Sequence, residues 1–253
     1  VFILCPAFMR TPFRFLFGAR SIFESIEFDS SKKTRVIVLE LASARLVREY
    51  EFDGFFGFHL GNAHERGDEI SVDALCVDTM DVMGGLADVF MERADDFRFL
   101  DNGARFTRFT LNLASGAKSR NPVGGAIAGE FPAWHPAQTG LENRYTWLST
   151  IIENGTPYGF NAIQKVDHQT GELKIHDFGE GRFSSEVNFI PLGEKAAEDE
   201  GYLISIVYNH ARKKSEVVIL NAGEMQRELA VIPLDHHVPF GFHGSYYAET
   251  FIS

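Results

Sequence analysis

The fold of this chain is decided by a stretch near its C-terminal end, Val217-Val218-Ile219-Leu220-Asn221-Ala222-Gly223-Glu224-Met225-Gln226, and by the run that follows it, Leu229-Ala230-Val231-Ile232. β-Branched and other apolar residues fill the two runs, and such residues favour strands. The segment between the runs holds Asn, Gly and Glu, which are typical of a turn. The stretch therefore predicts a strand, a polar turn and a second strand.

Three earlier segments resemble the turn of this stretch, so that the four segments begin at residues 39, 111, 166 and 220. Each follows an apolar run and precedes another, as in Val36-Ile37-Val38 before the first segment and Leu173-Lys174-Ile175 after the third. A repeat of about 50 residues built from short antiparallel strands is typical of propeller blades. The pattern alone fits a β-sandwich with ordinary hairpins equally well, and both folds are all-β.

The longest interval between these segments contains an insertion at residues 79–97. Its apolar residues recur at helical spacing, which predicts a short helix on a connecting loop. These residues are Val82, Met83, Leu86, Val89 and Phe90. No linker rich in Pro, Gly or Ser divides the chain, so we expect residues 1–253 to belong to one domain.

The composition limits the class of protein. Of the 253 residues 45% are hydrophobic and 23% are charged, as in a globular domain, and the net charge of −11 argues against a nucleic-acid partner. The two cysteines, Cys5 and Cys76, form no disulfide framework and favour a reducing compartment. No apolar run reaches the roughly 20 residues that a membrane span needs. We expect a cytoplasmic protein with peripheral membrane contact at most.

Four short segments carry residues that are suited to a metal site. Two contain a histidine beside glycine and aromatic residues, and two contain a glutamate that precedes a proline. The segments are Phe58-His59-Leu60-Gly61-Asn62-Ala63, Gly129-Glu130-Phe131-Pro132, Glu186-Val187-Asn188-Phe189-Ile190-Pro191 and Pro239-Phe240-Gly241-Phe242-His243-Gly244. Taken one at a time, a packed core histidine or a carboxylate at a strand end explains each of them as well.

Taken together and in this order, the four segments resemble the signature segments of the carotenoid cleavage oxygenases, non-haem iron enzymes that split a polyene double bond with dioxygen. The resemblance extends over essentially the whole chain and favours a seven-bladed β-propeller over the sandwich, with this chain as its C-terminal portion. It implies that His59 and His243 bind Fe²⁺ and that Glu130 and Glu186 hold the imidazoles. It also implies two further histidine ligands upstream of Val1.

The substrate of such an enzyme is a water-insoluble polyene. We expect a tunnel wall of aromatic residues near the ligand segments, formed by Phe55, Phe56, Phe58, Trp134 and Phe240. The segment 7–20 is aromatic and basic and has no acidic residue, which suits a membrane interface. It resembles the hydrophobic tunnel entrance of the animal-type branch of the family, and its candidate contacts are Phe13, Phe15, Leu16 and Phe17. An ordinary buried strand and turn is the alternative for this segment.

The resemblance implies an iron(II) dioxygenase that cleaves a carotenoid or apocarotenoid to aldehyde or ketone products. With two of four histidine ligands, the chain by itself is expected to be inactive. A stilbenoid-cleaving dioxygenase and a retinoid isomerohydrolase on the same scaffold stay open, as does a non-catalytic propeller that serves as a binding module. We expect His64 to pack or to face the cavity, and His168 and His176 to be exposed beside a hairpin turn. We expect the remaining histidines to lie in turns or on the surface: His135, His210, His236 and His237.

Overall fold

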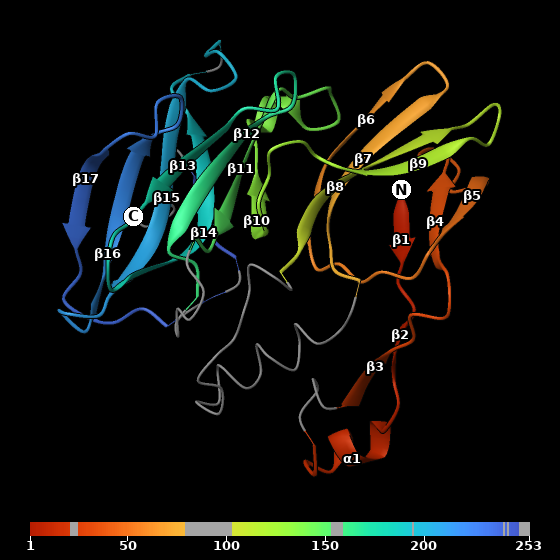
Figure 1. Ribbon diagram of the computed structural model, residues 1–253, viewed down its shortest axis with the longest axis horizontal. Coiled ribbons are helices and arrows are strands. Elements are labelled where there is room, and N and C mark those ends of the chain that lie inside the picture. The colour runs from red at the N-terminus through yellow and green to blue at the C-terminus, as the bar shows by residue number, and fades with distance from the viewer. Residues whose placement is uncertain are drawn as a thin grey trace.

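The computed structural model describes residues 1–20, 25–78, 103–152, 159–193, 195–239, 241 and 243–247. In these residues four antiparallel sheets follow one another in chain order and lie side by side (Figure 1). The first sheet holds β1 (Phe2–Leu4), β4 (Thr34–Leu39) and β5 (Leu46–Phe52). The second holds β6 (Leu60–Arg66), β7 (Glu69–Cys76), β8 (Arg105–Asn112) and β9 (Lys118–Pro122).

The third and fourth sheets have the same order of four strands. The third holds β10 (Gly129–Ala133), β11 (Tyr145–Thr150), β12 (Ala162–Asp167) and β13 (Leu173–Asp177). The fourth holds β14 (Arg182–Pro191), β15 (Gly201–Asn209), β16 (Lys214–Asn221) and β17 (Glu228–Pro233). A separate pair, β2 (Ala7–Met9) and β3 (Ile26–Phe28), lies beside the short helix α1 (Pro12–Leu16), and a 3-10 turn η1 spans Pro136–Gln138.

Each sheet buries a face against the next one, as blades of a propeller do. Strand β7 is buried on both sides: Val72 packs in the core shared with the first sheet, while Leu75 packs in the core shared with the third. The core between the third and fourth sheets contains Trp147 and Leu203. Because apolar side chains on both faces must be covered, stacking of consecutive sheets stabilises every one of them. The all-β propeller architecture predicted from the sequence is confirmed.

The four similar turn segments have one geometry. Each connects the last two strands of a sheet, and in each the sixth residue donates its backbone N–H to the carbonyl of the second, over 2.8 to 3.0 Å. The sixth residue has a positive φ in all four turns: Ala44 (54°), Gly116 (77°), Gly171 (72°) and Met225 (56°). The predicted strand–turn–strand repeat is therefore confirmed at the level of hydrogen bonds.

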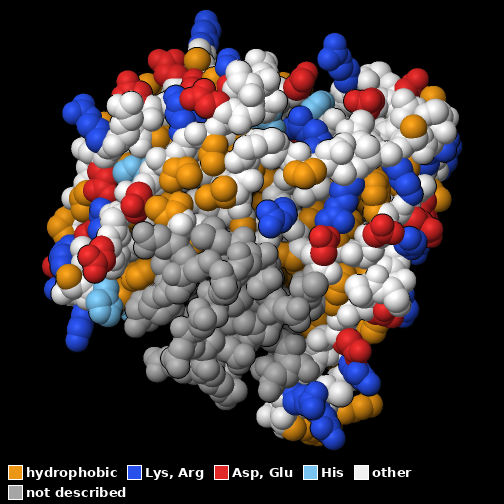
Figure 2. All heavy atoms as spheres, in the orientation of Figure 1, with side chains coloured by type: hydrophobic (Ala, Val, Ile, Leu, Met, Phe, Trp, Pro, Cys, Tyr) orange, Lys and Arg blue, Asp and Glu red, His pale blue; other side chains and the backbone are white. Residues whose placement is uncertain are grey.

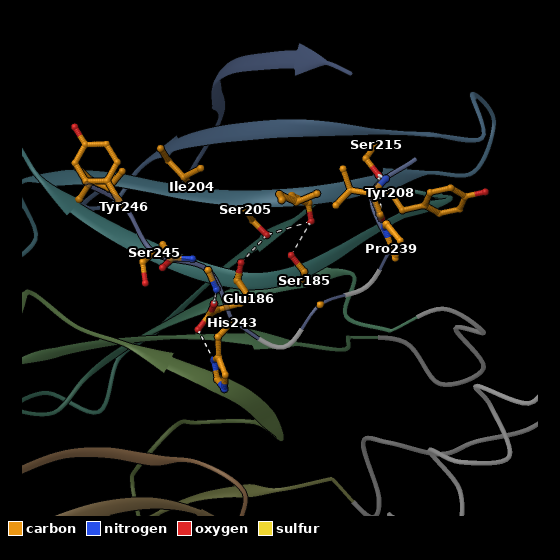
Figure 3. Close-up of a pocket in the computed structure, with 16 residues that line it drawn as sticks. Ser185, Glu186, Ile204, Ser205, Tyr208, Ser215, Pro239, His243, Ser245 and Tyr246 are labelled. Atoms are coloured by element: carbon orange, nitrogen blue, oxygen red, sulfur yellow. Dashed lines mark hydrogen bonds and ion pairs between the residues drawn. The ribbon is translucent and has the colours of Figure 1, made fainter. Parts of the chain in front are cut away.

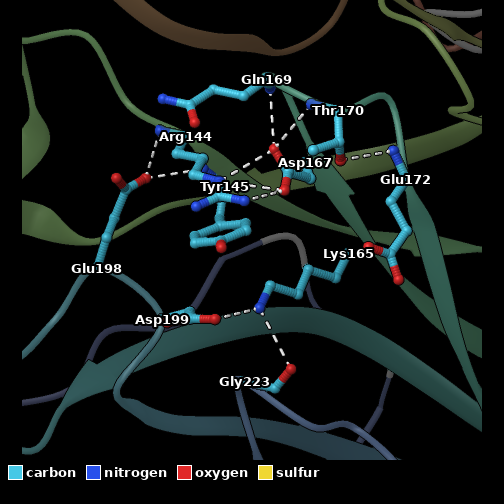
Figure 4. Close-up of polar contacts among 10 residues, drawn as sticks. All are labelled: Arg144, Tyr145, Lys165, Asp167, Gln169, Thr170, Glu172, Glu198, Asp199 and Gly223. Atoms are coloured by element: carbon cyan, nitrogen blue, oxygen red, sulfur yellow. Dashed lines mark hydrogen bonds and ion pairs between the residues drawn. The ribbon is translucent and has the colours of Figure 1, made fainter.

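Polar contacts join the third and fourth sheets at one end (Figure 4). The buried Lys165 on β12 donates to Asp199 Oδ2 over 2.5 Å and to the Gly223 carbonyl over 3.2 Å, and burial lowers the pKa of this lysine. Glu198 accepts the backbone N–H groups of Arg144 and Tyr145 over 2.6 and 2.7 Å. These contacts satisfy polar groups that the stacking of the two sheets buries.

A second polar network joins the second and third sheets. Asp73 on β7 accepts two hydrogen bonds of 2.8 Å from Arg108 on β8. His168 accepts from the same guanidinium at Nδ1 over 3.1 Å and contacts Thr146 Oγ1 through Nε2 over 2.9 Å. Burial lowers the pKa of His168 to about 4, although the charge of Asp73 opposes this shift, so this histidine is neutral at pH 7.

The expectation that His168 and His176 are exposed is wrong, since His168 is partly covered and His176 is buried, whereas His135 does begin the turn η1 but is buried there. His135 is 4% exposed against the ring of Phe189, and His176 is 7% exposed with Nδ1 on the Met225 carbonyl over 3.1 Å. Both are packed by residues far away in sequence. The predicted helix at 79–97 lies entirely outside the described residues, and the number of seven blades stays a prediction.

Candidate metal centre

His59 lies just before β6 and pairs with Glu130 of the third sheet. Its Nδ1 is 2.7 Å from Glu130 Oε2, and the two side chains are 19% and 14% exposed. A carboxylate only accepts, so Nδ1 carries the hydrogen and Nε2 keeps its lone pair. Burial raises the pKa of Glu130 above its ordinary value, and the contact with His59 offsets part of this rise. The His59 backbone is fixed as well, because its carbonyl accepts the Leu75 N–H over 3.0 Å.

His243 follows β17 in the C-terminal segment and pairs with Glu186 on β14 (Figure 3). Its Nδ1 is 3.1 Å from Glu186 Oε1, and the Gly244 backbone N–H donates to Glu186 Oε2 over 2.6 Å. The carboxylate thus holds the imidazole and the adjacent backbone at once. A cavity of about 350 Å³ lies between this segment and the sheet, lined in part by Ser185, Ile204 and Tyr246.

The two pairs come together although their members lie far apart in the sequence. The ring centroids of His59 and His243 are 5.2 Å apart, with an interplanar angle of 80°. Both rings also contact Phe131, at centroid distances of 4.7 Å from His59 and 5.8 Å from His243. The four residues that the sequence singled out therefore form one cluster, in which both imidazoles have Nδ1 bound to a carboxylate.

The first strands of three sheets carry a β-bulge next to this cluster. The register shifts between Leu60 and Ala63 in β6, between Glu130 and Ala133 in β10, and between Ser184 and Val187 in β14. Bulges interrupt the ladder and redirect side chains, and they are frequent beside active sites. Each strand is the edge of its sheet, which also explains how β10 accommodates Pro132.

Gly129 precedes Glu130 because the backbone is tightly packed at this point. A Cβ atom there would lie 2.9 Å from both Gln164 Nε2 and the Ser149 carbonyl oxygen. Gln164 is fully buried and binds Ile127 through both ends of its amide, over 3.0 and 2.9 Å. A glycine at residue 129 therefore lets β10 approach β11 and β12 closely enough to place Glu130.

Asn62 was part of the sequence motif but was given no role there. It lies in the β6 bulge, is 4% exposed, and its amide nitrogen donates to the carbonyls of Gln138 and Leu141 and to Asn143 Oδ1 over 2.7 to 3.0 Å. Its own carbonyl oxygen accepts the Gly140 N–H over 3.0 Å. Asn62 thus connects strand β6, which follows His59, to the loop after β10. The only sequence signal for this role is its fixed spacing from His59 in the motif.

The residues predicted to line the tunnel lie in different environments. Phe55 is 1% exposed and its ring stacks on Phe109 in the core between the first two sheets. Phe56 and Phe58 form an edge-to-face pair at 4.8 Å, and Phe58 lies 6.5 Å from the His59 ring. Trp134 donates to Thr139 Oγ1 over 3.1 Å. Phe240 lies outside the described residues, and the tunnel stays a prediction.

The helix α1 presents apolar side chains to solvent. Phe13, Leu16 and Phe17 are 73%, 72% and 80% exposed, and Phe15 is 39% exposed. Hydrophobic and basic side chains gather at the end of the molecule where α1 lies (Figure 2). Within the described ranges, no helix has the length and apolar character that crossing a bilayer requires.

The cluster fits a metal ion in the type of donor that it offers. Neutral imidazole nitrogens suit iron, and a carboxylate on the other ring nitrogen fixes the tautomer and raises the basicity of the ligand. The cluster offers two such donors, the imidazoles of His59 and His243. Among the described residues, no three His, Cys, Asp or Glu side chains are placed to hold an ion together. All nine histidines lie in the described ranges, and the other seven are not part of the cluster.

Comparisons with known proteins agree with this geometry. Residues 2–248 match the family profile described as retinal pigment epithelial membrane protein, RPE65. An apocarotenoid-15,15'-oxygenase of Synechocystis sp. is 30% identical over 237 residues, which are 93% of this chain and 47% of that protein. A carotenoid 9,10(9',10')-cleavage dioxygenase of Crocus sativus is 32% identical over 269 residues, which are 98% of this chain and 46% of that protein.

Solved structures show the same fold. The crystal structure of the cobalt-substituted Synechocystis enzyme superposes with a TM-score of 0.82 at 25% identity, over 97% of this chain and 50% of that one. A chimera of this enzyme with RPE65 gives a TM-score of 0.81 at 26% identity. The chain spans about half the length of the curated relatives it matches. By its profile match over residues 2–248, the chain belongs to the RPE65 family of carotenoid cleavage oxygenases.

Proposed function

We propose that this chain supplies half of the iron site of a dioxygenase that cleaves a double bond of a carotenoid or apocarotenoid. The observation that carries the proposal is the convergence of His59 and His243, each with Nδ1 bound to a carboxylate, to a ring separation of 5.2 Å. A bound iron(II) would supply the activation of dioxygen, and the products would be aldehydes or ketones. Two further ligands would come from residues beyond this sequence, and the chain alone would then be inactive.

The residues of this chain would act by positioning. Glu130 and Glu186 would keep Nδ1 protonated and the Nε2 lone pairs available, because each accepts the Nδ1 hydrogen. The apolar rings of Phe58 and Phe131 would exclude water and hold the polyene, which offers no polar group to recognise. Selection of the double bond would then depend on the shape of the apolar wall.

The test uses a polypeptide extended to the length of the relatives, with iron content and cleavage of an all-trans apocarotenoid as readouts. We expect about one iron per chain, and loss of both iron and cleavage in His59→Ala and in His243→Ala. His237→Ala is the matched control, because this exposed histidine packs on Tyr208 and is not one of the cluster residues. If the wild-type protein binds no iron and cleaves nothing, the proposal is contradicted and the non-catalytic binding module is supported. If it cleaves a stilbenoid but no apocarotenoid, the proposed substrate class is wrong.

We also propose that α1 contacts a membrane from which the polyene enters. Three exposed apolar side chains beside Arg14 on so short a helix are costly in water and suited to a lipid interface. The double substitution Phe13→Ser and Phe17→Ser should reduce binding to anionic liposomes at least fivefold in a sedimentation assay. Leu41→Ser, at a fully exposed residue in the first hairpin turn, should leave binding unchanged. Equal binding of both variants would contradict this role.

A further inference from the structure

Phe131 has a backbone conformation that sets it apart. Its φ is +57°, in the left-handed region. The other non-glycine residues with positive φ in the described ranges are Ala44, Lys213 and Met225, and these three lie in hairpin turns, where the turn requires that conformation. Phe131 lies inside strand β10.

This conformation is costly for the residue type and for its place in the sequence. A bulky side chain rarely adopts positive φ, and a residue before proline is normally extended, yet Pro132 follows Phe131. Such strain persists where the surrounding structure imposes it, and it is concentrated at functional sites. The positive φ of Phe131 is therefore expected to serve the cluster of His59 and His243 that its side chain contacts.

The consequence of the conformation is that two consecutive residues reach the same imidazole. In a regular strand consecutive side chains point to opposite faces. Here Glu130 Oε2 lies 2.7 Å from His59 Nδ1, while the Phe131 ring centroid lies 4.7 Å from that of His59. The left-handed residue in the β10 bulge removes the alternation and brings the carboxylate and the ring to one side.

The ring of Phe131 also completes a contact among three rings. It lies 5.8 Å from the His243 ring at an interplanar angle of 81°, and the two imidazoles are 5.2 Å apart at 80°. A hydrogen bond at Nδ1 fixes one edge of an imidazole but leaves the ring free to tilt about that bond. Contact with a third ring removes this freedom, and Phe160 supports Phe131 from behind with a centroid distance of 5.7 Å.

We propose that Phe131 is a positioning residue that sets the tilt of the His59 and His243 imidazoles relative to each other. The inference rests on the proposed role of both imidazoles as metal ligands. The glutamates fix the tautomer and Phe131 fixes the orientation, so that both Nε2 atoms are available to one ion. The strain at residue 131 is the structural cost of this arrangement.

The experiment compares Phe131→Ala, which removes the ring, with Phe131→Tyr, which keeps it. The first readout is the ¹⁵N imidazole NMR spectrum of the metal-free protein, and the second is a Co²⁺ titration followed by visible absorption. For Phe131→Ala we expect shifted or broadened imidazole signals at His59 or His243 with the tautomer unchanged, because the ring gains freedom to tilt, and at least tenfold weaker Co²⁺ binding. Phe131→Tyr should restore both to within twofold of wild type.

Ala44→Gly is the matched control, because it relieves a positive φ of 54° in a turn far from the cluster and should change neither readout. If Phe131→Ala fails to fold, Phe131→Leu keeps the apolar volume without the ring and serves as the test variant. Wild-type imidazole signals together with wild-type Co²⁺ affinity in the ring-less variant would overturn the proposal. The Co²⁺ titration uses the polypeptide extended to the length of the relatives; if its wild-type form binds no Co²⁺, the proposed function fails, while the imidazole spectra still test Phe131.

Discussion

The two halves of the candidate site are built differently. His59 is 19% exposed and its backbone carbonyl is hydrogen-bonded to β7. His243 is 60% exposed and lies in a segment with no assigned strand, where Glu186 holds both its ring and the following backbone N–H. The position of His59 is therefore fixed by its backbone as well as by its carboxylate partner. The position of His243 depends on one carboxylate, so removal of the partner glutamate should have different consequences at the two histidines.

The largest effect is expected at the His243 half. Glu186→Ala removes two hydrogen bonds to a carboxylate, each contributing about 1.5–3 kcal/mol, and so should release the C-terminal segment. Amide exchange at Gly244 should accelerate roughly a hundredfold, measured by hydrogen–deuterium exchange. Glu186→Gln, with one acceptor oxygen, should give an intermediate rate. Unchanged exchange at Gly244 in Glu186→Ala would show that other contacts hold the segment.

Acid should loosen the His59 half, because the second and third sheets meet at His168. The pKa of His168 is lowered from 6.5 to about 4 in the folded protein. Between these values the unfolded chain binds a proton that the folded chain does not, so stability falls as the pH decreases from 6.5 to 4. The loss attributable to this residue is at most about 3 kcal/mol.

Urea denaturation at pH 7 and at pH 4.5 measures this loss. The control is His168→Gln, which keeps a donor and an acceptor but does not titrate in this range. Its free energy of unfolding should decrease less than that of the wild type over the same interval. An equal decrease in the free energy of unfolding between pH 7 and pH 4.5 in the two proteins would exclude His168 as the acid-sensitive group.

Removal of the carboxylate at the His59 half should affect the whole fold. Glu130→Ala leaves the largely buried Nδ1–H of His59 without its partner, which costs about 1–3 kcal/mol of unfolding free energy. Glu186→Ala, at the more exposed pair, should lower the global stability by less than about 1 kcal/mol. Chemical denaturation of the two variants in parallel tests this order. A larger loss of stability in Glu186→Ala would mean that the His243 half, and not the His59 half, is the one built into the fold.

The smallest effect should come from a turn far from both histidines. Ala44 has φ +54° at the position where two of the sister turns have Gly116 and Gly171. Ala44→Gly should raise the free energy of unfolding by about 0.5–1 kcal/mol, since glycine adopts this conformation without strain but loses more entropy on folding. Thermal unfolding measures the gain, and a decrease in stability would mean that the turn is not strained.

Much of the fold was predictable, because the signals are local. The turn segments repeat a polar second residue, and two of them have a glycine at the sixth position, where the backbone is left-handed; the sequence shows both features. His59, Glu130, Glu186 and His243 could be selected since each lies in a short motif and the motifs occur in a fixed order. Neither inference required knowledge of which sheets pack together.

The errors come from contacts between sheets, which no local pattern reports. His176 lies beside a predicted turn, but the fourth sheet covers it through Met225. Phe55 lies near the His59 motif, but its ring belongs to the core shared with the first sheet. The left-handed φ of Phe131 was invisible for the same reason, because the segment Glu-Phe-Pro in isolation predicts an extended backbone.

The bulges in β6, β10 and β14 have a consequence for how this scaffold can change over evolutionary time. Each lies on the strand that begins its sheet, where one side of the ladder is unpaired, so the residues at the bulge contribute little to the pairing of the remaining strands. Substitutions there can alter which groups face the centre while the outer hairpins continue to hold the sheets together. Foldability and chemical specialisation are thereby assigned to separate strands, and new reactivity can be sampled without dismantling the architecture.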